Sequence, residues 1–110
     1  MSSKKSIKKN INELPSYEEW IVNSLKKKKE AVVYLQTALD DYQNDGNTEA
    51  LLLALRYLAM AQGGVAELAK KTNLSRETLY RTLSKQGNPK LQTLGRLLSG
   101  LGFRLVVKAA

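Results

Sequence analysis

The chain has 110 residues, 43% hydrophobic and 25% charged, with a formal net charge of +8 and neither cysteine nor histidine. Their absence excludes disulfides, thiol nucleophiles, imidazole bases and the usual zinc ligands, so we expect no enzyme, no metal site and no cofactor. No apolar run approaches the about 20 residues of a membrane span, and no signal-peptide core follows the lysine-rich start. The sequence therefore predicts one small cytoplasmic domain with an arm and no membrane partner.

The arm precedes the first predicted helix. Residues 1–12 are polar and basic, with only Ile7 and Ile11 to bury, and Pro15 ends the segment. Such a composition cannot supply a core, so residues 1–15 are predicted to be a flexible basic arm. Its lysines are either solvated or in contact with phosphate.

Residues 16–62 are predicted to form N-terminal helices that supply core and a partner-facing surface. Ser16 and Glu19 form a capping-box pattern that starts the first helix. The lysine run at 26–29 is expected on an exposed helix surface. The apolar residues of this first helix are Trp20, Ile21 and Leu25.

Two further helices follow on either side of a loop at residues 44–47. The second keeps helical spacing at Ala31, Leu35, Ala38, Leu39 and Tyr42. Either Asn47 or Thr48 can cap the third helix, and Gly63-Gly64 stops it. A wide apolar stripe on the third helix should supply much of the core: Leu51, Leu52, Leu55, Leu58 and Ala59. The acidic residues around the loop have no histidine or glycine-rich phosphate cradle beside them, and are expected to cap helices and solvate the loop.

The segment Val65–Ser84 predicts a helix-turn-helix. Leu68 and Ala69 fall on the buried face of its first helix, and Leu79 and Leu83 lie four apart on one face of its second. Asn73 occupies the tight turn, where the backbone must reach positive φ, and Ser75 is the expected N-cap. The second helix then leaves four residues off the leucine face, available to a DNA groove: Arg76, Glu77, Tyr80 and Arg81.

Positive charge is concentrated on the half of the chain that carries this motif. Residues 63–110 hold nine Lys or Arg against two Glu, a net +7, whereas residues 1–62 hold nine basic and eight acidic residues, a net +1. Such a distribution is typical of a phosphate-binding domain, although a solvated basic face would have the same composition.

A loop at residues 85–90 follows the second helix of the motif. The helix-turn-helix region continues after this loop to residue 102, and the C-terminal tail follows it. Gly87 and Pro89 prevent a simple helical continuation, and a further helix ends at Gly100 or Gly102. Its inward residues are expected to be Leu91, Leu94, Leu97 and Leu98. Residues 103–110 alternate in polarity and predict a short C-terminal β-strand, which needs a partner from a second copy, another protein or the arm. We expect it to form an antiparallel dimer ribbon through Phe103, Leu105 and Val107; the alternative is extension of a partner's sheet.

The chain resembles a known family over roughly residues 30–108. The resemblance rests on Gly63–Ser84, on Gly-Asn-Pro-Lys-Leu-Gln-Thr-Leu from Gly87 and on Leu-Gly-Phe-Arg-Leu-Val-Val from Leu101, with weaker support at 34–39 and 54–62. The combination of Leu-Ser-Arg-Glu-Thr-Leu-Tyr with Gly-Asn-Pro is similar to the probable addiction module antidotes, a branch of the lambda-repressor-like (Xre/Cro) helix-turn-helix superfamily. Asn73 stands where that family usually has Gly, and the basic N-terminal region is longer than the resemblance explains.

The resemblance implies a mainly α, five-helix-type lambda-repressor-like DNA-binding domain with extra N-terminal helices. It implies a cytoplasmic antitoxin that binds double-stranded operator DNA as a homodimer, represses its own operon and neutralises a RelE/ParE-like toxin. Carried onto this sequence, the base-reading positions are Arg76, Glu77 and Arg81. An Arg fork can pair with guanine and Glu can accept from cytosine, although Glu77 equally suits a helix N-terminus. Expected phosphate contacts are the Val65 amide, Thr78, Tyr80, Lys85, Asn88 and Lys90. For Tyr80 the alternative is packing against its own domain.

DNA binding is already accounted for by residues 63–102, so the N-terminal helices are expected to have another role. We expect a toxin-facing surface formed by Trp20, Ile21, Leu25 and the helix of Tyr34, because an amphipathic segment can wrap a partner. The alternative is that Trp20 packs on the core. For the protein as a whole, the competing function is a stand-alone phage-type or metabolic repressor, in which these helices complete the domain or sense a ligand.

Overall fold

Helix α2 (Tyr17–Ser24) begins at the expected capping box. In the computed structural model, which describes residues 16–110, the Ser16 amide donates to Glu19 Oε1 at 3.0 Å and the Glu19 amide donates to Ser16 Oγ at 3.1 Å. Two amides that a helix start leaves unpaired are thereby satisfied. The predicted basic arm lies outside the described residues.

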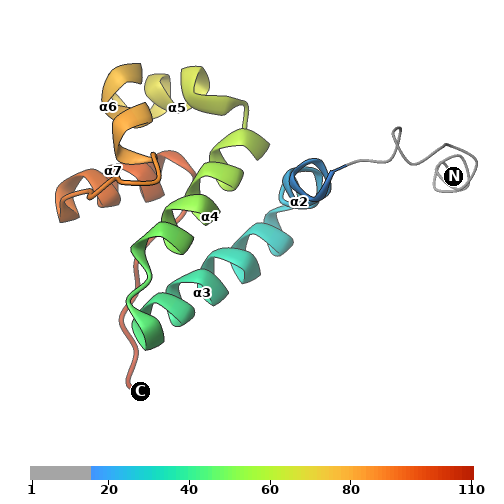
Figure 1. The fold of residues 1–110 in the computed structure, drawn as a ribbon, viewed down its shortest axis with the longest axis vertical. Helices are drawn as coiled ribbons and strands as arrows, with labels where there is room; N and C mark the ends of the chain where they lie inside the picture. Colours follow the sequence, from blue (N-terminus) through green and yellow to red (C-terminus); the bar gives the residue numbers. More distant parts are fainter. Residues whose placement is uncertain (1–15) are drawn as a thin grey trace, which may run out of the picture.

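Five more helices follow α2 within the described residues, which confirms the mainly α prediction (Figure 1). They are α3 (Lys28–Asp45), α4 (Thr48–Ala61), α5 (Gly64–Thr72), α6 (Arg76–Thr82) and α7 (Leu91–Gly100). Helices α2 and α3 pack on α4, and α5 packs on α4, α6 and α7. Helix α4 therefore lies between an N-terminal helical pair and the group formed by α5, α6 and α7.

The core is built around the apolar stripe of α4. All of the residues predicted for this stripe are buried, and α2, α3, α5, α6 and α7 each add buried side chains to the same cluster. Leu52, Leu55 and Leu58 are almost fully buried. Because each buried leucine contributes about 2 kcal/mol of transfer free energy, this stripe is a main source of stability.

Glycine and asparagine define the ends of α3, α4 and α5. Gly46 ends α3 at φ 68°, and the Asn47 side chain, rather than that of Thr48, accepts the Ala50 amide at the start of α4. Gly63 and Gly64, at φ 109° and 89°, turn the chain between α4 and α5. Over residues 16–110, no single helix is long and apolar enough to cross a membrane; α4 and α5 reach that composition only together, and they meet at a bend of 94°.

Two expectations about individual helices are wrong. Lys26 and Lys27 lie in the turn between α2 and α3 rather than on a helix surface, because α2 ends at Ser24 and α3 starts at Lys28. Leu91 is 76% exposed instead of buried, since it is the first residue of α7 and precedes the turn that packs on α5. Leu97 and Leu98 are buried as expected.

The predicted C-terminal strand is also wrong. No strand is assigned to residues 103–110; the Phe103 amide donates to the Leu98 carbonyl at 2.7 Å, and the Gly102 amide donates to the Ser99 carbonyl at 3.0 Å. These two bonds form a Schellman motif with Gly102 at φ 90°, and they hold Phe103 half-buried against the core. Residues 16–110 contain no strand with which the tail could pair, so the alternating pattern alone does not produce a ladder.

Close backbone packing fixes the last helix and the loop before it. A Cβ on Gly100 would lie 2.5 Å from Thr72 Cγ2, so α7 crosses α5 at a distance that only glycine permits. The Gln62 side chain donates to the Leu101 carbonyl at 2.7 Å and joins the end of α4 to the end of α7. A Cβ on Gly87 would lie 2.0 Å from the Thr82 carbonyl oxygen, so the 85–90 loop rests directly on the end of α6.

Candidate nucleic-acid interface

The turn between α5 and α6 has the geometry that the sequence predicted. Asn73 lies at φ 62° and donates its amide to the Ala69 carbonyl at 3.0 Å. Buried Thr72 supports the turn, because its hydroxyl donates to the Leu68 carbonyl at 2.8 Å and accepts the Leu74 amide at 3.3 Å. Ser75 Oγ accepts the Thr78 amide at 3.0 Å and caps α6. The helix pair is therefore fixed by local hydrogen bonds.

Helix α6 presents a polar face to solvent. Leu79, Thr82 and Leu83 are buried, and this burial confirms the predicted leucine face. Tyr80 is 64% exposed, so its ring does not pack into the core. Four side chains thus lie off the leucine face and exposed: Arg76, Glu77, Tyr80 and Arg81.

Arg56 also helps to hold α6 in place, a role that was not predicted from the sequence. It is half-buried on α4, and its Nη1 donates to the Leu83 carbonyl at the end of α6, 27 residues away. A cation at a helix C-terminus complements the helix dipole, so this bond fixes the end of the exposed helix. Arg56 is the lone basic residue in α4, and its place among leucines was the available signal.

A pocket of about 320 Å³ adjoins the hydrogen bond between Arg56 and Leu83. It lies between the end of α4, the start of α5 and the end of α6, and its mostly apolar lining includes Met60, Val65, Tyr80 and Leu83. Half-buried Val65 is the second residue of α5, where backbone amides lack an intrahelical partner. The structure thus brings Val65 and Tyr80, two of the predicted phosphate contacts, to the rim of the same pocket.

The remaining predicted phosphate contacts differ in their surroundings. Lys85 Nζ lies 3.4 Å from Glu49 Oε2, but both side chains are mostly exposed and such a pair contributes little. Asn88 and Lys90 are exposed in the 85–90 loop. Thr78 is half-buried, and its Oγ1 accepts a hydrogen bond from the Ser75 hydroxyl at 2.9 Å, so it belongs to the cap of α6.

The predicted toxin-facing residues separate into buried and exposed sets. Ile21 and Leu25 lie in the core, whereas Trp20 is 60% exposed and Tyr34 is half-buried. The Tyr17 ring lies 5.9 Å from that of Trp20 and 6.5 Å from that of Tyr57 on α4. Burial, followed by the nearby Tyr17 and Tyr57, raises the pKa of Tyr34 above its usual value of 10.0. An aromatic cluster therefore covers the junction of α2, α3 and α4.

A family model described as "Probable addiction module antidote protein" matches residues 17–109. The chain belongs to this family. It is also similar to a protein of Haemophilus influenzae described as uncharacterized, with 31% identity over 74 residues that cover 67% of this chain and 75% of the relative. No solved structure matches significantly.

The extent of the family match assigns α2 and α3 to the antidote pattern. The match begins at residue 17, the first residue of α2, and includes every helix described here. The earlier resemblance covered only residues from about 30 onwards, so the match adds α2. An addiction module antidote acts on a toxin, and the family therefore implies a toxin partner in addition to any nucleic acid.

Proposed function

We propose that this antidote binds double-stranded operator DNA through α6, represses its own operon and neutralises a RelE/ParE-like toxin. The observation that carries the proposal is the exposed polar face of α6, held by the Ser75 cap and the Asn73 turn, in a chain of the antidote family. On this proposal, helices α4–α7 form a lambda-repressor-like unit, and the role is regulatory rather than catalytic.

The chemistry of α6 suits the major groove. Arg76 and Arg81 are exposed, and a guanidinium fork can donate to O6 and N7 of guanine. Glu77 lies in the first turn of α6, where it favours the helix dipole and can accept from the cytosine amino group. The net charge of +7 on residues 63–110 would supply the salt-dependent attraction to phosphates.

A charge-matched substitution series tests base reading. We expect Arg76→Ala and Arg81→Ala to weaken operator binding by about 1 to 3 kcal/mol and to relax base preference. Arg96→Ala is the control, because it removes the same charge from an exposed position on another helix, α7. The assay is a gel-shift titration on the upstream region of the operon and on a scrambled duplex. If Arg76→Ala and Arg81→Ala each lower affinity equally on both duplexes, then these residues contact only phosphate.

Dimerisation and toxin neutralisation are separate parts of the proposal. A helix-turn-helix dimer would bind an inverted repeat with half-sites about 10 base pairs apart. The exposed tail at Leu105 and Val107, together with half-buried Phe103, is the proposed dimer contact. Light scattering of a chain ending at Gly102 tests it, since an unchanged dimer mass would place the interface elsewhere. Rescue of growth when the adjoining toxin gene is co-expressed tests neutralisation and separates an antidote from a stand-alone repressor.

A further inference from the structure

Two adjoining hollows lie along α3. One, of about 170 Å³, lies between α3 and the first half of α4, and the other, of about 250 Å³, lies between α2 and α3. Tyr34 and Thr37 line both hollows, so the two adjoin each other along α3. We call this combined feature the α3 groove.

The end of the α3 groove nearer α2 is apolar and exposed. Trp20 from α2 and Val33 from α3 both line it, and they are 60% and 65% exposed. Tyr17 extends the same surface, because its ring is 5.9 Å from that of Trp20. Large apolar side chains that gather in this way on a soluble chain are typical of a protein interface. Trp and Tyr are also the side chains that most often dominate binding energy.

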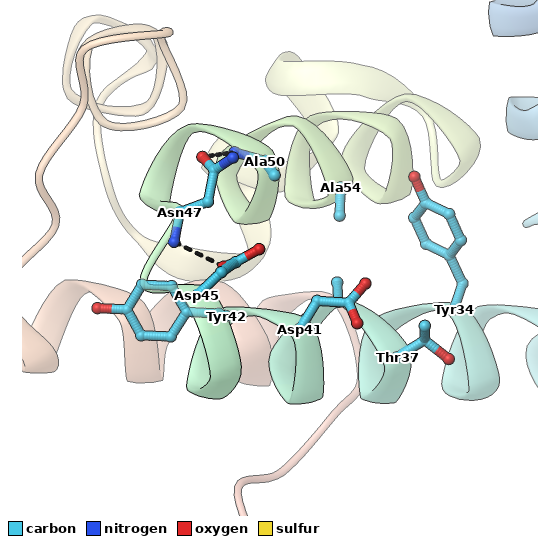
Figure 2. Close-up of a pocket in the computed structure, with 9 residues that line it drawn as sticks. Tyr34, Thr37, Asp41, Tyr42, Asp45, Asn47, Ala50 and Ala54 are labelled. Carbon is cyan, nitrogen blue, oxygen red and sulfur yellow. Dashed lines mark hydrogen bonds between the residues drawn. The ribbon is translucent and has the colours of Figure 1, made fainter.

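The other end of the α3 groove is acidic. Asp41 and Asp45 line it together with Tyr42, and small residues of α4, Ala50 and Ala54, form the facing wall (Figure 2). Figure 2 shows the Asp41 carboxylate pointing toward α4, and within residues 16–110 it has neither an ion pair nor a hydrogen bond. Asp45 accepts the Asn47 amide at 2.8 Å. A carboxylate beside a tyrosine ring suits a Lys or Arg side chain.

The charge of the surrounding helices favours a cationic occupant. Residues 16–62 hold five basic and seven acidic side chains, a net charge of 5 − 7 = −2, opposite in sign to the +7 of residues 63–110. The charged side chains that line the α3 groove are all acidic, namely Glu30, Asp41 and Asp45, so the groove itself would repel nucleic acid and attract a basic protein. Charge thus separates the occupant of the α3 groove from the ligand of α6.

We propose that the α3 groove binds a cationic amphipathic segment of the cognate toxin, an inference that rests on the antidote function proposed above. An apolar side chain of the segment lies against Trp20 and Val33, and a Lys or Arg lies against the Asp41 carboxylate. Val33 and Asp45 are twelve residues apart on α3, which corresponds to about 18 Å at 1.5 Å per residue. The segment is therefore a helix of about three turns or an extended stretch of about five residues.

The test compares neighbouring acidic positions on one helix. Asp41→Lys reverses a charge inside the α3 groove, whereas Asp40→Lys makes the same change one residue earlier, outside the groove, where Asp40 accepts from Gln36. Calorimetry with the toxin encoded by the adjoining gene should give at least about a tenfold loss of affinity for Asp41→Lys and less than about threefold for Asp40→Lys. Trp20→Ala should lose about 30-fold, as for a hot-spot residue.

Each outcome of this experiment has one meaning. Equal losses for Asp41→Lys and Asp40→Lys, with Trp20→Ala unchanged, would overturn the α3 groove and leave the antidote function standing. A wild-type chain that fails to bind the toxin would overturn both. A change in mass of Asp41→Lys without toxin would instead identify a second copy as the occupant and refute the proposal. Operator binding by the full-length variants checks their folding, because α6 lies outside the α3 groove.

Discussion

Replacing Gly87 with alanine perturbs the contact between the 85–90 loop and the end of α6. The added Cβ would lie 2.0 Å from the Thr82 carbonyl oxygen and 2.7 Å from its carbon, whereas real Cβ contacts essentially never fall below 3.0 Å. The loop must therefore shift by about 1 Å away from the Thr82 carbonyl group, because a backbone carbonyl cannot rotate out of the way as a side chain could. Such overpacking costs about 1 to 3 kcal/mol.

Gly95→Ala is the matched control for this substitution. Gly95 lies inside α7, and a Cβ there meets nothing within 4 Å. Alanine is favoured over glycine in a helix interior, so this variant should be more stable by about 0.5 to 1 kcal/mol. The two Gly→Ala changes are thus expected to have opposite signs.

Urea unfolding and thermal melts measure both changes. For a chain of this length, 1 kcal/mol corresponds to about 4 °C in Tm, so Gly87→Ala should melt about 4 to 12 °C lower and Gly95→Ala about 2 to 4 °C higher. The urea slope should stay constant in both variants. A Gly87→Ala variant as stable as wild type would refute the close approach of the loop to Thr82.

Three other predictions follow from contacts described above. Arg56→Met removes the donor to the Leu83 carbonyl and should lower stability by about 1 kcal/mol and weaken operator binding, as measured by urea unfolding and gel shift; unchanged binding would exclude a role for this tether in positioning α6. Asn73→Ala should be less stable than Asn73→Gly by about 1 kcal/mol because φ is positive there, and equal melts would contradict the strain argument. Since the folded-state pKa of Tyr34 is raised above 10.0, the stability linked to its protonation is complete below pH 10 and is lost as pH rises through the folded pKa; Tyr34→Phe should flatten this alkaline loss in urea titrations, and an unchanged pH profile would contradict the shift.

Local signals in the sequence predicted most of the fold. Ser16, Ser75 and Asn73 act on backbone groups within four residues, so each cap or turn can be inferred without knowing the tertiary structure. The leucine stripe of α4 was equally accessible, because its helical spacing describes one continuous face. These features determined where α2 and α6 begin, where α5 ends and which face α4 buries.

Features that depend on distant partners could not be predicted in the same way. The alternation after Phe103 resembles a strand, but a strand forms only when another backbone pairs with it, and the Schellman motif at the end of α7 holds Phe103 instead. Arg56 reaches a carbonyl 27 residues away; its place among leucines singles it out, but no local pattern indicates its partner. The burial of Ile21 and Leu25 depends on where α2 packs on α4, so the sequence assigned core residues to a surface.

The unequal charge of the two halves has a kinetic consequence. Residues 63–110 carry +7 and residues 1–62 only +1, so positive charge is concentrated in the half of the chain that contains α6 (Figure 1). The electric field of a polyanion would rotate the protein before contact so that α6 faces the polyanion, and a larger share of encounters would then be productive. This orienting force decays over about 8 Å at physiological ionic strength. Added salt should therefore lower the association rate constant before it dissociates the formed complex.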